Sequence, residues 1–177
     1  VGRDVSQGEV LNHRTARSED DSRNALDEAA RIVRGDILDM RDLETDDFEA
    51  ALFVGGGGVL STWTDYHERG AECRVTERLK FHVLDFYRDD RAVLALDNAG
   101  FALGSIFRHV ENPPVLNPGD NDRLVRTLEN WDLDVTNRSP CWDRDRRVGC
   151  LPDLTRENDL PNLRRSLRDF FVLGGIA

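Results

Sequence analysis

The chain has 177 residues, of which 39% are hydrophobic and 33% charged, and its formal net charge is −10. Its length and hydrophobic content are those of one domain with a single core, and no apolar run reaches the roughly 18 residues of a membrane-spanning helix. The acidic charge argues against a general nucleic-acid binder, because phosphate contacts need a basic surface, so we expect neither a direct nucleic-acid partner nor membrane insertion.

Residues 1–20 are polar and charged without a sustained period, and we interpret them as an N-terminal arm. A helix is predicted from a cap at Ser22 to about Arg34, and Gly35 supplies its stop. Residues 36–40 are compatible with a short strand. The apolar positions of the helix share one face: Ala25, Leu26, Ala29, Ile32 and Val33.

Two short apolar runs have the length of buried strands. Phe48–Val54 leads into four consecutive glycines, Gly55–Gly58. Ala92–Leu96 breaks at Asp97 and Asn98, where small residues begin another helix. Ligands of open α/β sheets gather at the carboxyl ends of strands, where glycine lets the backbone come close. The glycine run is not a nucleotide fingerprint, because it has neither the GxGxxG spacing nor the Gly-Lys-Ser/Thr ending of a P-loop.

The rest of the chain continues the alternation of helices and strands, which predicts a mostly parallel sheet with helices on both faces. Thr76 is the predicted cap of a helix that runs to about Arg88. Four further elements are predicted: a helix at about Asp122–Trp131, a strand near Leu133–Val135, a hairpin across Cys141–Leu151 and a helix at about Leu160–Leu173.

Cysteine and histidine usage gives no sign of a metal or a disulfide framework. Cys73, Cys141 and Cys150 are an odd number without a CxxC spacing, which is typical of a reducing, intracellular compartment. No two histidines are spaced with a carboxylate as metal ligands are, so we predict no metal and no cofactor. Because the chain begins with Val1 and lacks a secretory signal core, we expect it to begin after processing or inside a longer product.

Three segments resemble a known family: residues 24–37, Ala51–Gly57 and Gly70–Val75. They are similar to the isoprenoid-biosynthesis glyoxalase ElbB and its mitochondrial relatives, within the PfpI-type class I glutamine amidotransferase-like superfamily. The resemblance runs from about Val10 to the C-terminus, and from Asn112 onward it is one of pattern only. It implies a flavodoxin-like three-layer α/β sandwich.

The family's reactive cysteine has no counterpart here. In such proteins the second buried strand ends in a tight turn that lifts a cysteine beside a helix N-terminus, which lowers the pKa of its thiol. The corresponding turn reads Leu96–Leu103, and Asp97 takes the place of that cysteine. A carboxylate is favoured at a helix N-terminus, so this exchange keeps the fold while removing thiolate chemistry. Cys73 matches another cysteine of the family, for which we predict a structural role.

The start of the family's domain is also missing. Its members begin with a strand, an acid-bearing glycine loop, a helix and a second strand, all before the segment that matches Val10. Because that first strand lies centrally in a flavodoxin-like sheet, its absence leaves unpaired backbone groups along a buried edge. We therefore expect residues 21–177 to form an incomplete PfpI/ElbB-like domain, whose N-terminal strands are supplied by another segment or by a partner chain.

Four residues besides Asp97 are candidates for the site. The amides of Gly57 and Gly58 could hold an oxyanion, unless these glycines only shape a turn. Asn98 lies at the start of the helix that follows Asp97. His67, close to the glycine run in sequence, could approach Asp97 as an acid/base partner, or it could be a loop histidine.

Three functions stay open at this point. The favoured one is a non-catalytic accessory subunit of a larger assembly, a pseudoenzyme that packs against a protein partner. The second is a hydrolase with Asp97 as nucleophile, His67 as base and the Gly57 and Gly58 amides as oxyanion donors. The third is residual glyoxalase-like activity in a complex with an intact paralogue. Relatives of this kind occur in bacterial cytosol and in mitochondria, and the start at Val1 rather than methionine leads us to expect the mitochondrial matrix rather than the cytoplasm.

Overall fold

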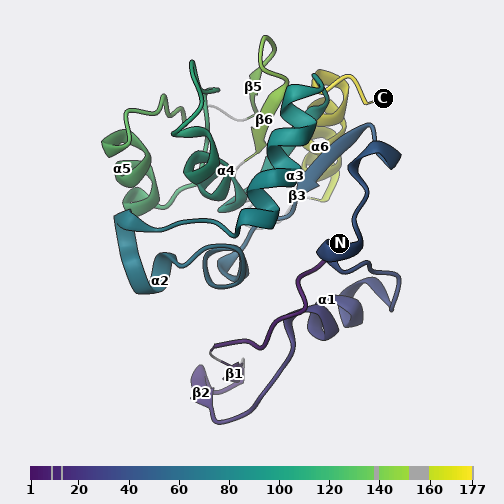
Figure 1. Cartoon of the computed structure of the whole chain (residues 1–177), viewed down its shortest axis with the longest axis vertical. Coiled ribbons are helices and arrows are strands. Elements are labelled where there is room, and N and C mark those ends of the chain that lie inside the picture. Colours follow the sequence, from purple (N-terminus) through teal and green to yellow (C-terminus); the bar gives the residue numbers. More distant parts are fainter. Residues whose placement is uncertain (9, 13, 138–139, 152–159, 177) are drawn as a thin grey trace. The chain divides into compact units, whose positions relative to one another are not determined.

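The computed structural model describes residues 1–8, 10–12, 14–137, 140–151 and 160–176 (Figure 1). It divides into two compact units, Val1–Glu44 and Thr45–Ala177, and each unit is described by itself. Among the described residues, every helix is too short or too polar to cross a membrane.

The first unit contains a small hairpin that the sequence did not predict. Strands β1 (Val10–Asn12) and β2 (Arg17–Glu19) pair antiparallel, with Val10 opposite Glu19. The side-chain oxygen of Asn12 accepts hydrogen bonds from the N–H groups of Arg14 and Thr15 at 2.9 and 3.2 Å. These bonds shape the turn between the two strands. Strands of three residues are too short to show a period, so the expected arm contains structure that periodicity could not reveal.

Helix α1 (Ala25–Val33) begins later than predicted. Its cap is Asn24, whose side-chain oxygen accepts the N–H groups of Leu26 and Asp27 at 2.8 and 3.4 Å; the prediction of Ser22 was wrong. Arg34 adopts the left-handed conformation at the end of the helix, before Gly35. The helix therefore stops where the glycine predicted.

The short strand predicted at residues 36–40 does not form. Asp39 makes a single parallel bridge with Gly2, and a 3₁₀ helix begins at Met40 (Met40–Asp42). The side chain of Asp39 accepts the N–H of Arg41 at 2.8 Å. This local hydrogen bond caps the 3₁₀ turn and competes with an extended backbone.

The second unit is built on a four-stranded sheet of order β3-β4-β6-β5. Strands β3 (Ala50–Phe53), β4 (Ala92–Leu96) and β6 (Val148–Leu151) are parallel, and β5 (Cys141–Asp143) pairs antiparallel with β6. The mostly parallel sheet and the hairpin at its end are thus confirmed. The strand predicted near Leu133–Val135 is wrong, because Val135 makes only one isolated bridge, with Leu116.

Helices cover both faces of this sheet, which gives the three layers expected of a flavodoxin-like α/β fold (Figure 1). Helices α3 (Glu77–Arg88) and α4 (Ala99–Phe107) contact β4, and α5 (Asp122–Asn130) contacts α4. Helix α6 (Leu160–Leu173) packs on the opposite face through Phe170. Residues Leu94, Leu151 and Phe170 are fully buried together there, and each contributes roughly 1.5–3 kcal/mol to stability.

The segment between β3 and α3 is held by aromatic contacts. It contains a π-helix (Val59–Trp63), helix α2 (Tyr66–Arg69) and a 3₁₀ helix (Gly70–Glu72). The Tyr66 ring lies 5.0 Å from the ring of Phe101 in α4, and the indole N–H of Trp131 donates to the carbonyl of Ala71 at 3.0 Å. These contacts fix α2 beside the start of α4.

Candidate functional site

Asp97 forms a sharp turn between β4 and α4. Its φ of +49° is in the left-handed region, which aspartate tolerates better than most residues. Its N–H donates to the carbonyl of Leu151 at 2.8 Å, and its own carbonyl accepts the N–H of Gly100 at 3.0 Å. The turn therefore joins the last rung of the sheet to the first turn of α4. It places the half-buried Asp97 at the carboxyl edge, next to the helix N-terminus.

Glycines let three segments meet at this turn. A Cβ atom on Gly55 would lie 1.9 Å from the carbonyl oxygen of Leu96, and one on Gly100 would lie 2.2 Å from the carbonyl oxygen of Asn117. Real Cβ atoms do not approach backbone oxygens so closely. The glycine after β3 and the loop before α5 are therefore both pressed against the Asp97 turn.

The loop at Asn117–Gly119 also reaches the side chain of Asp97. Gly119 has a φ of +82°, and a Cβ atom on it would lie 2.6 Å from Oδ1 of Asp97. Asn117 is 3% exposed, and its side-chain oxygen accepts the N–H of Gly119 at 3.0 Å. The Asp97 carboxylate thus lies against backbone that a buried asparagine holds in place. The sequence reasoning missed this loop, although Asn-Pro-Gly is a turn signal.

The other predicted site residues are less closely gathered. Asn98 is half-buried and precedes α4, as expected. Gly57 and Gly58 are exposed before the π-helix, and Gly55 rather than these two approaches the Asp97 turn. His67 is exposed on α2, with its ring 6.2 Å from that of Tyr66. The oxyanion role of the two glycines and the pairing of His67 with Asp97 stay predictions.

All three thiols are buried and protonated at neutral pH. Burial raises the pKa of Cys73 to about 11 and that of Cys150 to about 12. Burial, together with the nearby charge of Asp143, also raises the pKa of Cys141. A thiol acts as a nucleophile only as the thiolate, so none of these cysteines is poised for the chemistry of the family's cysteine.

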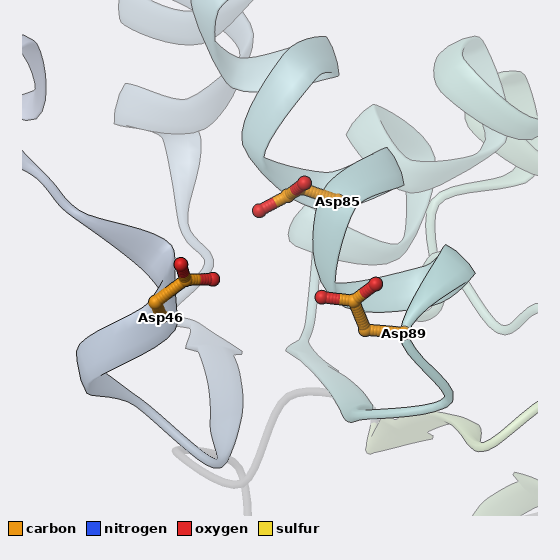
Figure 2. Close-up of side chains that lie close together, drawn as sticks. All are labelled: Asp46, Asp85 and Asp89. Atoms are coloured by element: carbon orange, nitrogen blue, oxygen red, sulfur yellow. The ribbon is translucent and has the colours of Figure 1, made fainter.

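A second polar cluster lies at the amino ends of β3 and β4, at the other end of the strands from Asp97. Figure 2 shows the carboxylates of Asp46, Asp85 and Asp89, the first from the 3₁₀ helix before β3 and the others from the end of α3. Their oxygens lie within 4.8 Å of one another, which makes them the group among the described residues that could hold a cation. The prediction that no metal binds is not tested by this geometry.

Arg91 supplies the positive charge of this cluster. It donates to Asp89 at 2.8 Å, to Asp85 at 3.4 Å and to the carbonyl of Phe48 at 3.1 Å, and its guanidinium stacks on the Phe86 ring. Asp85 and Asp89 are therefore paired with a half-buried arginine, and Arg91 also donates to the carbonyl of Thr45 in the 3₁₀ helix (Thr45–Asp47) that carries Asp46. An open cavity of about 620 Å³ adjoins them, lined by Asp46, Asp47, Phe48, Glu49, Asp89, Asp90, Arg91 and Arg147.

Comparisons with known proteins place this geometry in a family context. No protein-family model matches the chain. The chain is 31% identical over 109 residues to the human glutamine amidotransferase-like class 1 domain-containing protein 3, mitochondrial, covering 61% of this chain and 41% of that protein. It is 34% identical over 85 residues to the rat ES1 protein homolog, mitochondrial, covering 48% and 32%. These matches span less than half the length of the curated relatives.

Two solved structures share the fold. A crystal structure of an isoprenoid biosynthesis protein with an amidotransferase-like domain from Ehrlichia chaffeensis superposes with a TM-score of 0.82 at 18% identity, covering 97% of this chain and 80% of that one. A ThiJ/PfpI domain protein from Brachyspira murdochii gives 0.53 at 12% identity, covering 96% and 73%. The resemblance stated from the sequence is thus confirmed: the chain is similar to glutamine amidotransferase-like and ES1 proteins and has a ThiJ/PfpI-type fold.

Proposed function

We propose that this relative of the glutamine amidotransferase-like and ES1 proteins is a non-catalytic accessory subunit, a pseudoenzyme that acts within a larger protein assembly. The observation that carries the proposal is Asp97, which lies between β4 and α4 with its backbone in the left-handed conformation. By the sequence resemblance, this is the position of the reactive cysteine. A carboxylate is stable beside the N-terminus of α4, so the exchange keeps the turn and removes the thiolate.

The absence of a thiol at this turn supports a non-catalytic role. Addition of a thiolate to a glyoxal-type aldehyde, the reaction that the resemblance implies, needs a cysteine at this turn. The protonated thiols of Cys73, Cys141 and Cys150 are no substitute. The backbone of Gly119 lies against the Asp97 carboxylate, so protein already occupies one side of this side chain.

The names of its relatives support a mitochondrial setting for the subunit. The human, rat and zebrafish proteins that the chain resembles are all named as mitochondrial. We place this chain in the mitochondrial matrix, with the cytoplasm as the alternative. Its partners are proteins rather than nucleic acid or lipid, since its formal charge is −10.

Two measurements on the purified chain test this function. Consumption of a glyoxal-type aldehyde should not exceed that of the Asp97→Ala variant. The native mass, with identification of every co-purifying polypeptide, should reveal a larger particle. Turnover that Asp97→Ala abolishes would contradict the non-catalytic role. A homologous partner that retains the cysteine would instead indicate a glyoxalase-like complex in which this chain assists.

A second function is favoured by the same turn. A carboxylate at a strand-to-helix turn can displace halide from an alkyl halide, or open the ring of an epoxide, to form an ester, and water then hydrolyses that ester to an alcohol and the free carboxylate. His67 would be the base, which requires it to reach the Asp97 ester. In ¹⁸O-labelled water, repeated turnover would place the label in the Asp97 carboxylate, and mass spectrometry of the peptide that contains it would detect this. Absence of label together with absence of turnover excludes this function.

A further inference from the structure

Two of the three cysteines lie directly opposite each other in the hairpin of β5 and β6 (Figure 1). The antiparallel register pairs Cys141 with Cys150, and both thiols are free and buried. Side chains that are directly opposed across an antiparallel pair lie on the same face of the sheet and within contact of each other. Because strand pairing rather than sequence spacing brings the two cysteines together, counting cysteines along the chain does not reveal the pair.

The backbone of β6 determines how far apart the two cysteines are. The N–H of Asp97 donates to the carbonyl of Leu151 at 2.8 Å, so Leu151 directs its carbonyl toward β4. Successive residues of a strand direct their polar groups to opposite sides, so Cys150 directs its own toward β5. Cys141 and Cys150 are therefore a hydrogen-bonded pair, for which the Cα atoms are about 5.5 Å apart. Disulfides span Cα distances of about 4.4–6.8 Å, so the strands already have the spacing that a disulfide needs.

The two thiols also point to the same side of the sheet. Trp142 and Leu151 pack with Phe170 on the face that α6 covers. Cys141 and Cys150 are each one residue away from these two, so their side chains point to the opposite face. Both requirements for a disulfide, the Cα spacing and a shared face, are therefore met by this pair.

On that face the cysteines contact the loop that leads to the turn at the end of β4. The S–H of Cys141 donates to the carbonyl of Val115 at 3.7 Å, and the carboxylate of Asp143 accepts the N–H of Val115 at 3.2 Å. Cys150 interacts with the backbone of Asn117. Strand β5 and the thiol pair therefore hold residues 115–117, directly before the glycine that lies against the Asp97 carboxylate.

We infer that Cys141 and Cys150 form a reversible dithiol–disulfide site, which a small-molecule disulfide such as glutathione disulfide closes. Closure joins the edge strand β5 covalently to β6 and thereby fixes the loop at residues 115–119. The site involves no chemistry at Asp97, so it stands whether or not the chain is catalytic.

Oxidation by glutathione disulfide balances in two exchange steps. The Cys141 thiolate first attacks one sulfur of glutathione disulfide, whose S–S bond breaks as the new S–S bond forms, and one glutathione leaves as the thiolate. The Cys150 thiolate then attacks the sulfur of Cys141 and releases the second glutathione. Two protein thiols are oxidised, one disulfide is reduced to two glutathiones, and the protons of the protein thiols pass to the leaving thiolates.

Burial determines the order of these steps. Cys141 is 7% exposed on β5, which among the described residues pairs only with β6, whereas Cys150 is 0% exposed on the strand behind it. Burial raises the pKa of both thiols, which keeps them unreactive while β5 is paired, so attack needs local opening of this three-residue edge strand. Cys141 is therefore the entry thiol, and closure of β5 returns it to Cys150. In a reducing compartment the dithiol is the resting form, and the disulfide forms when oxidised glutathione accumulates.

The test equilibrates the full reduced chain with mixtures of reduced and oxidised glutathione, once in buffer and once in urea. The native chain should lose the mass of two hydrogen atoms. Trypsin cleaves at the arginines between the two cysteines, so after alkylation of free thiols the disulfide should join two peptides. We expect the equilibrium constant for closure to be about tenfold or more larger in buffer than in urea, because strand pairing holds the thiols side by side.

Three variants assign the roles of the cysteines. Cys73→Ser is the matched control, because Cys73 is buried outside the sheet, and it should form the same disulfide as the parent chain. Cys150→Ser should stop at a glutathione adduct on Cys141, whereas Cys141→Ser should stay reduced. Mapping of the disulfide in the unmodified chain decides the question even where a variant does not fold.

Hydrogen exchange tests the effect of closure on the fold. In the oxidised chain the amides of β5 should exchange about tenfold more slowly, since the opening of the edge strand is restricted. Exchange at residues 115–119 should slow with them, and dithiothreitol should reverse both changes. Unchanged exchange at residues 115–119 would overturn the coupling between the thiol pair and this loop.

Three other results would overturn the site itself. The first is a native chain that stays reduced in a glutathione mixture that oxidises the chain in urea. The second is a native chain that carries separate glutathione adducts on both cysteines, and the third is a disulfide between two copies of the chain.

Discussion

The regions at the two ends of strand β4 are held together by different interactions. At its carboxyl end, Asp97 turns the chain into α4 among glycines that let backbone pack on backbone. At its amino end, Arg91 joins carboxylates and carbonyl oxygens through hydrogen bonds. The first region depends on the absence of side chains and the second on their charges. Substitutions should therefore affect the two ends through different physical terms, and four predictions test this.

The largest effect is expected at Gly55. A Cβ atom there would lie 1.9 Å from the backbone oxygen of Leu96, so Gly55→Val must displace the Asp97 turn. We expect a loss of about 3 kcal/mol or more in the free energy of unfolding, measured by urea denaturation. Gly57→Ala is the control, because a Cβ atom on Gly57 meets nothing within 4 Å. Equal losses in both variants would refute the close packing at the turn.

The next effect is expected at Arg91. Arg91→Met leaves Asp85, Asp89 and the carbonyl of Phe48 without their shared donor in a half-buried setting. We expect a loss of about 2–3 kcal/mol that high salt reduces only in part. Arg31→Met, which breaks an exposed pair with Glu28, should cost less than about 0.5 kcal/mol. A similar small cost at Arg91 would mean that the cluster is a surface feature.

Cys150 in β6 should make the free energy of unfolding depend on pH in the alkaline range. Its folded-state pKa of about 12 exceeds that of an unfolded thiol, about 8.5, so the folded state keeps the proton longer. The stability from this group is full below about pH 8.5 and falls as the pH rises toward its folded pKa, by up to about 1.4 kcal/mol per pH unit. Between about pH 8 and 10.5, the free energy of unfolding measured with urea should decrease less steeply with pH in Cys150→Ala than in the parent chain. Identical slopes would contradict the burial of this thiol.

The smallest effect is expected for Asp97→Asn. Asparagine tolerates the left-handed backbone as aspartate does, so the turn is kept while the negative charge beside the N-terminus of α4 is lost. We expect a change of about 0.5 kcal/mol in the free energy of unfolding. Asp97→Val, which cannot adopt that backbone without strain, should cost about 1–3 kcal/mol. If both substitutions cost the same, the turn is not held in the left-handed region.

Elements with a clear period were predictable from the sequence. Strand β4 at Ala92–Leu96 and helix α6 at Leu160–Leu173 have the predicted bounds, because each apolar pattern is long enough to fix its element. The hairpin at Val10–Glu19 was missed, since its strands have three residues each. The cap predicted at Ser22 was wrong, because the actual cap, Asn24, is a residue type that accepts the same hydrogen bonds.

The candidate site was predictable only in part. The turn at Asp97 follows from a buried strand that ends before small residues, and the family resemblance marks its importance. The approach of Gly119 and Asn117 was not predictable, because about 20 residues and the whole of α4 separate them from Asp97 and only tertiary packing joins them. The cluster around Arg91 was missed for the same reason, since pairing of β3 with β4 brings its members together.

The central claim is that Asp97 stands where the family's reactive cysteine would be activated. Its most direct test is the pH dependence of thiol reactivity in the Asp97→Cys variant. We expect a single fast-reacting thiol with a pKa below about 8.5, lowered by the N-terminus of α4, on a parent chain whose own thiols react only after unfolding. A new thiol with an ordinary or raised pKa, reacting no faster than Cys73, would show that the turn does not activate a nucleophile, and the account of this chain as an altered enzyme would be wrong.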